Sequence, residues 1–285
     1  MTTATKAPVL IHCMHAPAAE GFAAASGGYA LVHWLPDLVP ERLLAHAESI
    51  LAEHPRHGYT SVLVAGSNGH YVAESYTPAG AHIQFCGHGA MAAAWWVLHA
   101  IEASRRFVAF TSAHHSWHAR RSEPTEADTD IALAYARPDP LGCAVPEFAP
   151  ACLGSQPVAA ATVGDAAGYL VIEVGSALTV QQLQPDLAAL GAATGRALIV
   201  TARAPLAANA APHRLPGCVF RYFAPQYGVP EDAATGSAAV QLAAYWSARL
   251  PAAKLTLRQL SPQGAAMQVA CHADTVELLA RVGYG

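Results

Sequence analysis

The sequence lacks the motifs of several large functional classes. Its six cysteines form no Cys-x-x-Cys pair, which argues against a zinc ribbon or a thioredoxin-like site. No Gly-x-Gly-x-x-Gly follows a strand-like segment and no P-loop is present, so an oxidoreductase or another cofactor-dependent enzyme is a poor interpretation. No run of lysine and arginine occurs and the net charge is −4, which disfavours nucleic acid as a partner.

Long apolar runs and signs of disorder are also missing. The stretch AMAAAWWVLHAIEA is interrupted by His99 and Glu102, and it is too short for a membrane helix of about 20 residues. The first residues, MTTATKAPVLIHCMHAP, carry no long apolar core and no cleavage signature of a signal peptide. Charged residues make up 13% and hydrophobic residues 53%, as in a well-packed globular protein. We therefore expect a cytoplasmic protein without a membrane partner and with reduced cysteines.

Most cysteines and histidines have ordinary structural explanations. Every cysteine except Cys86 is expected to be a small buried hydrophobe. The densest histidine group comprises His114, His115 and His118, beside the strand-like segment RFVAFTSA. Metal ligands must converge on one ion at about 2.0–2.1 Å, and these three would do so only in a helix. We expect a solvated loop or strand edge here, and no metal site.

The length of 285 residues is sufficient for two domains of about 140 residues. Alternating or apolar segments predict strands, and segments with helical spacing or apolar on all sides predict helices. The predicted strands of the first half lie at 7–16, 29–35, 60–77 (a hairpin) and 106–113, and its helices lie at 40–54 and 89–104. The predicted strands of the second half lie at 131–136, 157–164, 168–175, 196–204, 218–225, 254–261, 265–273 and 276–283, and its helices lie at 179–195 and 235–250.

Both halves follow the same order: strands, an amphipathic helix, strands, a turn of small residues, a buried Ala-rich helix with a tryptophan, and strands. The two turns lie about 150 residues apart. This order indicates an internal duplication at domain scale. The polar segment 121–130 (RSEPTEADTD) is the best candidate for a linker or an exposed hairpin tip. We predict an N-terminal lobe at 1–128 and a C-terminal lobe at 129–285, with the final strand able to return to the first lobe.

The two turns could together form an anion site. The first turn of a helix exposes unpaired N–H groups and partial positive charge, and glycine lets a ligand approach that backbone. Two helix termini that face each other could hold a carboxylate and stabilise an enolate. An acid and a base beside it could then move a proton. The candidates are Cys86 and His88 in the first turn, and Asp232 and Ser237 in the second.

Each of these residues also has an ordinary explanation. Gly236, Ser237 and Asp232 could cap a helix, and His88 or Cys86 could satisfy local packing. The paired layout favours the site, because two unrelated caps need not share such similar surroundings.

Two segments of the sequence resemble the signatures of a known family. RYFAPQYGVPEDAATGSAAVQLAAYW (221–246) resembles the second-half signature of the PhzF-like (phenazine biosynthesis-like) proteins, relatives of diaminopimelate epimerase and proline racemase. YTPAGAHIQFCGHGAMAAA (76–94) resembles their first-half signature. The resemblance covers most of the chain in order and length.

The resemblance implies an α+β, diaminopimelate epimerase-like fold with two pseudo-symmetric lobes, each a barrel-like sheet around a central helix. It implies cofactor-independent proton transfer on a small carboxylic acid in the cleft between the lobes, and a homodimer. His88 and Asp232 match the active-site histidine and acid of the family, and Cys86 matches the first thiol of the epimerases. Thr235 falls at the second thiol position, so a two-thiol racemase is not supported. The implied substrate-binding residues are Gly87, Gly89, Thr235, Gly236, Ser237 and Tyr59.

One departure concerns the catalytic base. The family usually carries a glutamate between the first helix and the next strand. Here that segment reads HPRHGYTSVLVA, with Gly58 or Tyr59 at the expected position. Three explanations stay open. Another group, such as His54, His57, Cys86 or Asp232, takes the proton; or the reaction differs; or the protein is a non-catalytic carboxylate-binding or degenerate relative.

Overall fold

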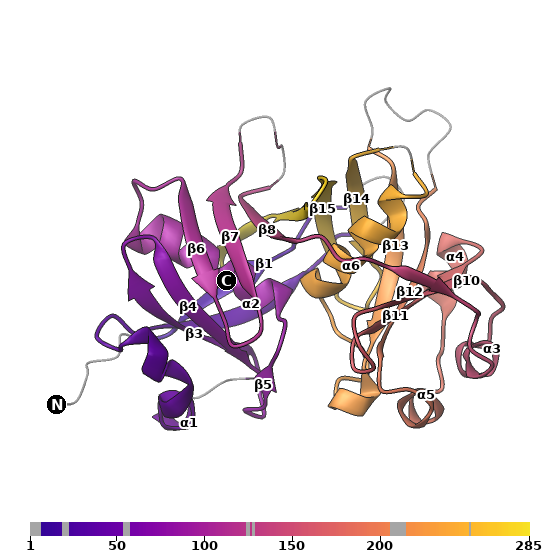
Figure 1. Cartoon of the computed structure of the whole chain (residues 1–285), viewed down its shortest axis with the longest axis horizontal. Coiled ribbons are helices and arrows are strands. Elements are labelled where there is room, and N and C mark those ends of the chain that lie inside the picture. The colour runs from indigo at the N-terminus through magenta and orange to yellow at the C-terminus, as the bar shows by residue number, and fades with distance from the viewer. Residues whose placement is uncertain are drawn as a thin grey trace. The chain divides into compact units, whose positions relative to one another are not determined.

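The computed structural model describes residues 7–18, 23–53, 58–123, 126, 129–205, 215–250 and 252–285 (Figure 1). Contacts divide the chain into two units. Unit 1 comprises Met1–His15, Gly27–Tyr135 and Leu278–Gly285, and unit 2 comprises Ala16–Ser26 and Ala136–Glu277. The predicted lobes, 1–128 and 129–285, stay a prediction of domain boundaries.

Unit 1 is built on a sheet in the order β17-β1-β2-β3-β4-β6-β7-β8. Neighbours are antiparallel except at β2–β3 and β4–β6, which are parallel. The short strand β5 also pairs with β4. The strands are β1 (Val9–Cys13), β2 (Gly28–Trp34), β3 (Thr60–Ser67), β4 (His70–Tyr76), β5 (His82–Ile83), β6 (Phe107–Thr111), β7 (Ser116–Arg121), β8 (Ile131–Ala136) and β17 (Val282–Tyr284).

Two helices pack on opposite faces of this sheet because successive strand residues point to opposite sides. Helix α2 (Gly87–Trp96) contacts β1, β2, β3, β4, β7 and β17, and eight of its ten residues are buried. A π-helical turn, η2 (Val97–Ile101), follows it. Helix α1 (Leu43–Glu53), preceded by the 3-10 turn η1 (Pro40–Arg42), packs an apolar stripe against Leu63 and Ala65 of β3.

Unit 2 is built on a sheet in the order β9-β10-β11-β12-β13-β14-β15, antiparallel except at β11–β12 and β13–β14. Helix α6 (Gly236–Ser247) is buried along eleven of its twelve residues. The strands are β9 (Leu141–Cys143), β10 (Pro157–Val163), β11 (Tyr169–Val174), β12 (Ala197–Arg203), β13 (Gly217–Phe223), β14 (Lys254–Gln259), β15 (Ala265–Cys271) and β16 (Thr275–Ala280), of which the last spans the division between the units. The other helices are α3 (Phe148–Leu153), α4 (Ala177–Gln182), α5 (Leu187–Ala193) and the 3-10 turn η3 (Pro225–Tyr227).

The strand pairings repeat from one unit to the other. The series β1-β2-β3-β4-β6-β7 and the series β10-β11-β12-β13-β14-β15 share the same sequence of antiparallel, parallel, antiparallel, parallel and antiparallel neighbours. The second parallel crossover contains α2 in unit 1 and α6 in unit 2. The predicted fold class, with two similar halves and a buried central helix in each, is confirmed.

Some predicted elements were wrong. The single helix predicted at 179–195 is two helices, α4 and α5, because Pro185 lacks an N–H and disfavours helix at the residue before it. Asp186 then starts α5 by accepting a hydrogen bond from the N–H of Ala189 at 2.9 Å. The strand predicted at 276–283 is divided into β16 and β17, and α3 and β9 were not predicted.

The structure also shows how far the cysteines are buried and which strands flank the polar segment 121–130. Cys13, Cys152 and Cys218 are buried as predicted, but Cys143 is exposed on β9, so its assignment as a buried hydrophobe was wrong. The strands that flank segment 121–130, β7 and β8, are antiparallel neighbours; residues 124–125 and 127–128 of the segment lie outside the described residues. Among the helices that the structure describes, none is both long and apolar enough to cross a membrane.

Candidate active site

In unit 1 the first candidate motif forms the N-terminal turn of α2. Cys86 is the N-cap residue, with extended backbone (φ −116°, ψ 99°) and no capping hydrogen bond from its side chain. Its carbonyl oxygen accepts a hydrogen bond from the N–H of Ala90 at 3.0 Å. The thiol is thus not used to cap the helix.

The thiol of Cys86 lies beside an imidazole. The distances from Cys86 Sγ to Nδ1 and Nε2 of His88 are 3.7 and 4.0 Å. Both residues are partly exposed. A thiol next to an imidazole can exchange a proton with it, as required of an acid–base pair.

A second thiol contacts the backbone of this turn. Cys13, at the end of β1, is fully buried, and its Sγ donates to the carbonyl oxygen of His88 at 3.5 Å. Burial raises the pKa of the Cys13 thiol, and the neighbouring Cys86 raises it further. Cys13 therefore stays a neutral thiol, and its contact positions the backbone of His88.

Gly89 is required by close packing of the turn against the sheet. A Cβ added at this position would lie 2.6 Å from Ser75 Oγ, 3.0 Å from Val62 Cγ2 and 3.1 Å from Cys86 Sγ. These distances are shorter than ordinary van der Waals contacts. The glycine thus allows α2 to approach β3 and β4 with the Cys86 thiol directly beside it.

A small pocket of about 20 Å³ adjoins this turn, with Glu74, Ser75, Cys86 and His115 among its lining residues. This volume is sufficient for about one water molecule. Glu74 is only 1% exposed, and the sequence did not single it out. Its Oε2 lies 2.7 Å from Nε2 of His82, and its Oε1 accepts the N–H of Ala113 at 2.7 Å. Because both oxygens already have partners, Glu74 holds β5 and the segment that follows β6.

In unit 2 the acidic pair of the second motif is divided between two tasks. Glu231 makes a two-pronged ion pair with Arg221 of β13, at 2.6 Å (Nε–Oε1) and 2.7 Å (Nη2–Oε2). Arg221 also donates to the carbonyl oxygen of Leu183 at 2.6 Å. Glu231 is therefore occupied in fixing the loop to the sheet. Asp232 is partly exposed, and its Oδ2 accepts a hydrogen bond from Thr235 Oγ1 at 2.7 Å.

Helix α6 begins as α2 does. Thr235 is its N-cap residue, with φ −109°, ψ 88° and no capping hydrogen bond from the side chain. Each dihedral lies close to its counterpart at Cys86 in unit 1. Gly236 and Ser237 form the first buried turn. The ordinary explanation of Ser237 as a helix cap was wrong, because the cap position is Thr235 and its hydroxyl bonds to Asp232 instead.

Gln259, at the end of β14, holds the turn before α6. It was not predicted from the sequence as a site residue. Its side chain is buried, and its Oε1 accepts the N–H of Thr235 at 2.6 Å. Its Nε2 donates to the carbonyl oxygen of Asp232 at 2.5 Å and to Thr235 Oγ1 at 3.1 Å. These three bonds join the end of a strand to the whole Asp232–Thr235 turn.

The remaining predicted site residues have other placements. Tyr59 precedes β3, and its ring packs against Tyr29 with centroids 5.8 Å apart, in a series that continues to His12 and His15. Among the described residues, the ring that Tyr59 contacts is that of Tyr29, and no ring contact joins Tyr59 to the first turn of α2. His54 and His57 lie outside the described residues. No group of three metal-ligating side chains is found among the described residues.

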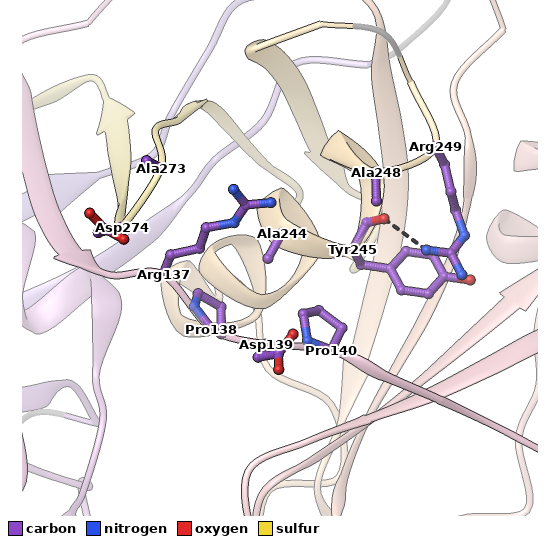
Figure 2. A pocket seen from close by; sticks show the side chains of 10 residues that line it. All are labelled: Arg137, Pro138, Asp139, Pro140, Ala244, Tyr245, Ala248, Arg249, Ala273 and Asp274. Carbon is purple, nitrogen blue, oxygen red and sulfur yellow. Dashed lines mark hydrogen bonds between the residues drawn. The ribbon is translucent and has the colours of Figure 1, made fainter.

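One cavity in the described part of unit 2 does not involve the motifs. It measures about 410 Å³ and lies in unit 2, where the last turns of α6 meet the segment that begins at Arg137 (Figure 2). Arg249 lies over the ring of Tyr245, 3.6 Å from its centroid, and donates to the Tyr245 carbonyl oxygen. None of the predicted site residues lines this cavity.

Comparison with known proteins places the chain in a family. The family model described as phenazine biosynthesis-like protein matches residues 75–274, which include both motifs. This chain belongs to the phenazine biosynthesis-like (PhzF-like) family. Two curated relatives from Pseudomonas aeruginosa, each named an uncharacterized isomerase, are similar to it. One is 33% identical over 79% of this chain and 76% of the relative, and the other is 32% identical over 66% of each.

A solved structure of the PhzF family and one of a probable proline racemase share the fold. A phenazine biosynthesis protein of the PhzF family from Enterococcus faecalis gives a TM-score of 0.74 at 23% identity, over 97% of this chain and 96% of that one. A probable proline racemase from Agrobacterium radiobacter, solved with bound carbonate, gives a TM-score of 0.53 at 10% identity, over 98% and 90%. The predicted family and epimerase-like fold are therefore confirmed.

Proposed function

We propose that this protein is an isomerase that moves a proton on a small carboxylic acid without a cofactor. The observation that carries the proposal is the matched pair of helix starts. In each unit a buried helix begins at a non-helical N-cap residue whose side chain does not cap it. Neither N-cap side chain thus occupies the N–H groups of its first turn, and these groups would bind the anion. The curated relatives named as isomerases support this class over a non-catalytic binding protein.

The family resemblance implies a site in a cleft between the two lobes, and in this proposal the two helix starts hold the substrate carboxylate. Gly87 and Gly89 would present backbone N–H groups from α2, and Gly236 and Ser237 would do so from α6. Thr235, whose N–H is bonded to Gln259 Oε1, would adjoin the carboxylate at the start of α6. Negative charge that develops when the neighbouring carbon loses its proton would be stabilised by the same groups. Tyr59 would contact the rest of the substrate.

The proposed proton-transfer groups are Asp232, His88 and Cys86. Cys86 and His88 form a thiol–imidazole pair, and Asp232 is a carboxylate with one oxygen engaged by Thr235. Glu74 is not proposed as the base, because His82 and Ala113 engage both of its oxygens. His54 and His57 stay candidates from the sequence. The homodimer, the cytoplasmic location and the absence of nucleic-acid and membrane partners stay predictions.

Solvent deuterium incorporation tests the proposal. The protein is incubated in D₂O with dihydro-hydroxyanthranilate-type acids, cyclic imino acids and α-amino acids, and deuterium at carbon is read by mass spectrometry and proton NMR. We expect exchange next to a carboxylate, reduced at least about 100-fold in Asp232→Asn and in Cys86→Ser, since an acid–base group contributes about 10²–10⁴-fold.

Matched variants control for nonspecific effects. Asp139→Asn and Cys143→Ser change an exposed carboxylate and an exposed thiol outside the motifs, and they should exchange as the wild type does. Full exchange activity in Asp232→Asn would remove that residue from the mechanism. Binding of a panel acid without any exchange by the wild type would refute the isomerase and favour a binding protein.

A further inference from the structure

Three hydrogen bonds fix the orientation of the Gln259 amide. The N–H of Thr235 requires an acceptor, and the atom 2.6 Å from it must therefore be Gln259 Oε1. The carbonyl oxygen of Asp232 requires a donor, which must be Gln259 Nε2. A flipped amide would place donor against donor and acceptor against acceptor. The assignment of the two ends thus follows from the backbone.

The amide in turn fixes the direction of the next hydrogen bond. Gln259 Nε2 donates to Thr235 Oγ1 at 3.1 Å, so this hydroxyl oxygen accepts a hydrogen bond from the amide. Its own proton is then directed to the remaining partner, Asp232 Oδ2, at 2.7 Å. The direction runs from Gln259 through Thr235 to Asp232. Such a series of hydrogen bonds is mutually reinforcing where it is buried, and Gln259 and Thr235 are 1% and 4% exposed.

The hydroxyl of Thr235 is free for this use because it does not cap α6. Among the residues that the structure describes, Oδ1 of Asp232 receives no hydrogen bond, although the carboxylate is partly exposed. The two oxygens therefore differ: Oδ2 is held and Oδ1 is open. A charged oxygen that accepts a short hydrogen bond is fixed in place, and its partner is aimed by the same bond.

We infer that Gln259 and Thr235 are positioning residues that hold Asp232 as a proton acceptor and aim its Oδ1 at the substrate. This inference rests on the proposed proton transfer by Asp232. It adds two residues that touch no reacting atom, assigns the reactive oxygen, and gives Asp232 the role of base. The position that holds a thiol in the epimerases is here occupied by a hydroxyl whose task is to orient an acid.

Two substitutions separate the parts of this network. Thr235→Val keeps the shape and the backbone N–H but removes the hydroxyl, so only the bond to Asp232 and the bond from Gln259 Nε2 to the hydroxyl are lost. Gln259→Met fills similar space but removes all three amide bonds. Thr235→Ser retains the hydroxyl and is the conservative control.

The first measurement needs no substrate. Hydrogen–deuterium exchange of the Thr235 amide reports whether Gln259 Oε1 accepts it. We expect protection in the wild type, Thr235→Val and Thr235→Ser, and at least about tenfold faster exchange in Gln259→Met, as expected for a lost buried hydrogen bond. Unchanged protection in Gln259→Met would overturn the orientation on which the inference depends.

The second measurement uses the panel acid that gives the fastest deuterium incorporation. We expect kcat for exchange to fall about 10- to 100-fold in Thr235→Val and Gln259→Met with little change in KM, and to be retained in Thr235→Ser. Wild-type kcat in a folded Thr235→Val protein would overturn the positioning role. No exchange by the wild type with any acid would instead refute the proposed function, and the positioning role would fall with it, while the amide measurement would still decide the hydrogen-bond pattern.

Discussion

Glu231 and Asp232 are adjacent acids, and replacing each of them by its amide should affect the stability of the protein differently. In Glu231→Gln, the two-pronged bond to Arg221 loses its charge and one of its acceptors, because an amide presents N–H₂ where the carboxylate presented an oxygen. The guanidinium is then left largely buried without a neutralising charge, with the Leu183 carbonyl and one amide oxygen as its hydrogen-bond acceptors. We expect Glu231→Gln to destabilise unit 2.

The size of the loss follows from the burial of the pair. Removing one partner of a buried ion pair costs about 3–5 kcal/mol. The side chains of Arg221 and Glu231 are 11% and 17% exposed, so solvent screens their charges slightly. We therefore expect a cost at the lower end of this energy range. About 3 kcal/mol lowers Tm by about 6–12 °C in a unit of this size.

Asp232→Asn should leave Tm within about 2–4 °C of the wild type, because the asparagine carbonyl oxygen still accepts the hydroxyl of Thr235 and less than about 1 kcal/mol is lost. Thermal unfolding followed by circular dichroism measures both variants. Glu147→Gln, at an exposed glutamate, is the matched control. The reasoning would be refuted if Glu231→Gln melted with the wild type, or if Asp232→Asn melted as low as Glu231→Gln.

Two further predictions concern packing and pH. Gly89→Ala places a methyl group 2.6–3.1 Å from three atoms and should lower the free energy of unfolding by about 1–3 kcal/mol in urea titrations; Ser75→Gly should restore part of this, and Gly142→Ala, with open space around it, should have little effect. Burial raises the pKa of Cys218 from 9.0 to about 12. Between these values the folded state keeps a proton that the unfolded state releases, so stability falls as pH rises through that window. Urea titrations at pH 8, 10 and 11 should show a shallower fall for Cys218→Ala, and an equal fall would contradict it.

The elements that could be predicted from the sequence are those with a strong local pattern. Helices α2 and α6 are apolar on all sides, which predicts burial wherever they lie in the fold. The β3–β4 hairpin contains Asn68 and Gly69, both with positive φ, as the tight turn requires. The prediction of a single helix at 179–195 was wrong at Pro185, because the apolar residues keep a helical spacing across a proline, which interrupts a helix.

The missed site residues depend on partners far away in the chain. Gln259 lies 24 residues from Thr235, and nothing in the segment KLTLRQLS distinguishes a glutamine that holds a turn from one that faces solvent. Glu74 is buried only because Ala113, 39 residues later, and His82 supply donors. Hydrophobic spacing indicates which strands form, and it does not indicate which polar side chains find partners inside them.

The path of the chain between the units affects the order of folding during synthesis. Domains usually fold in the order in which they leave the ribosome. In unit 1, however, the first strand, β1, has β17 as a neighbour, with Ile11 opposite Tyr284. The sheet β9–β15 of unit 2 is synthesised in between. Unit 2 can therefore complete its sheet first, and the nascent N-terminal half must keep one edge of β1 uncovered until residues 282–284 emerge.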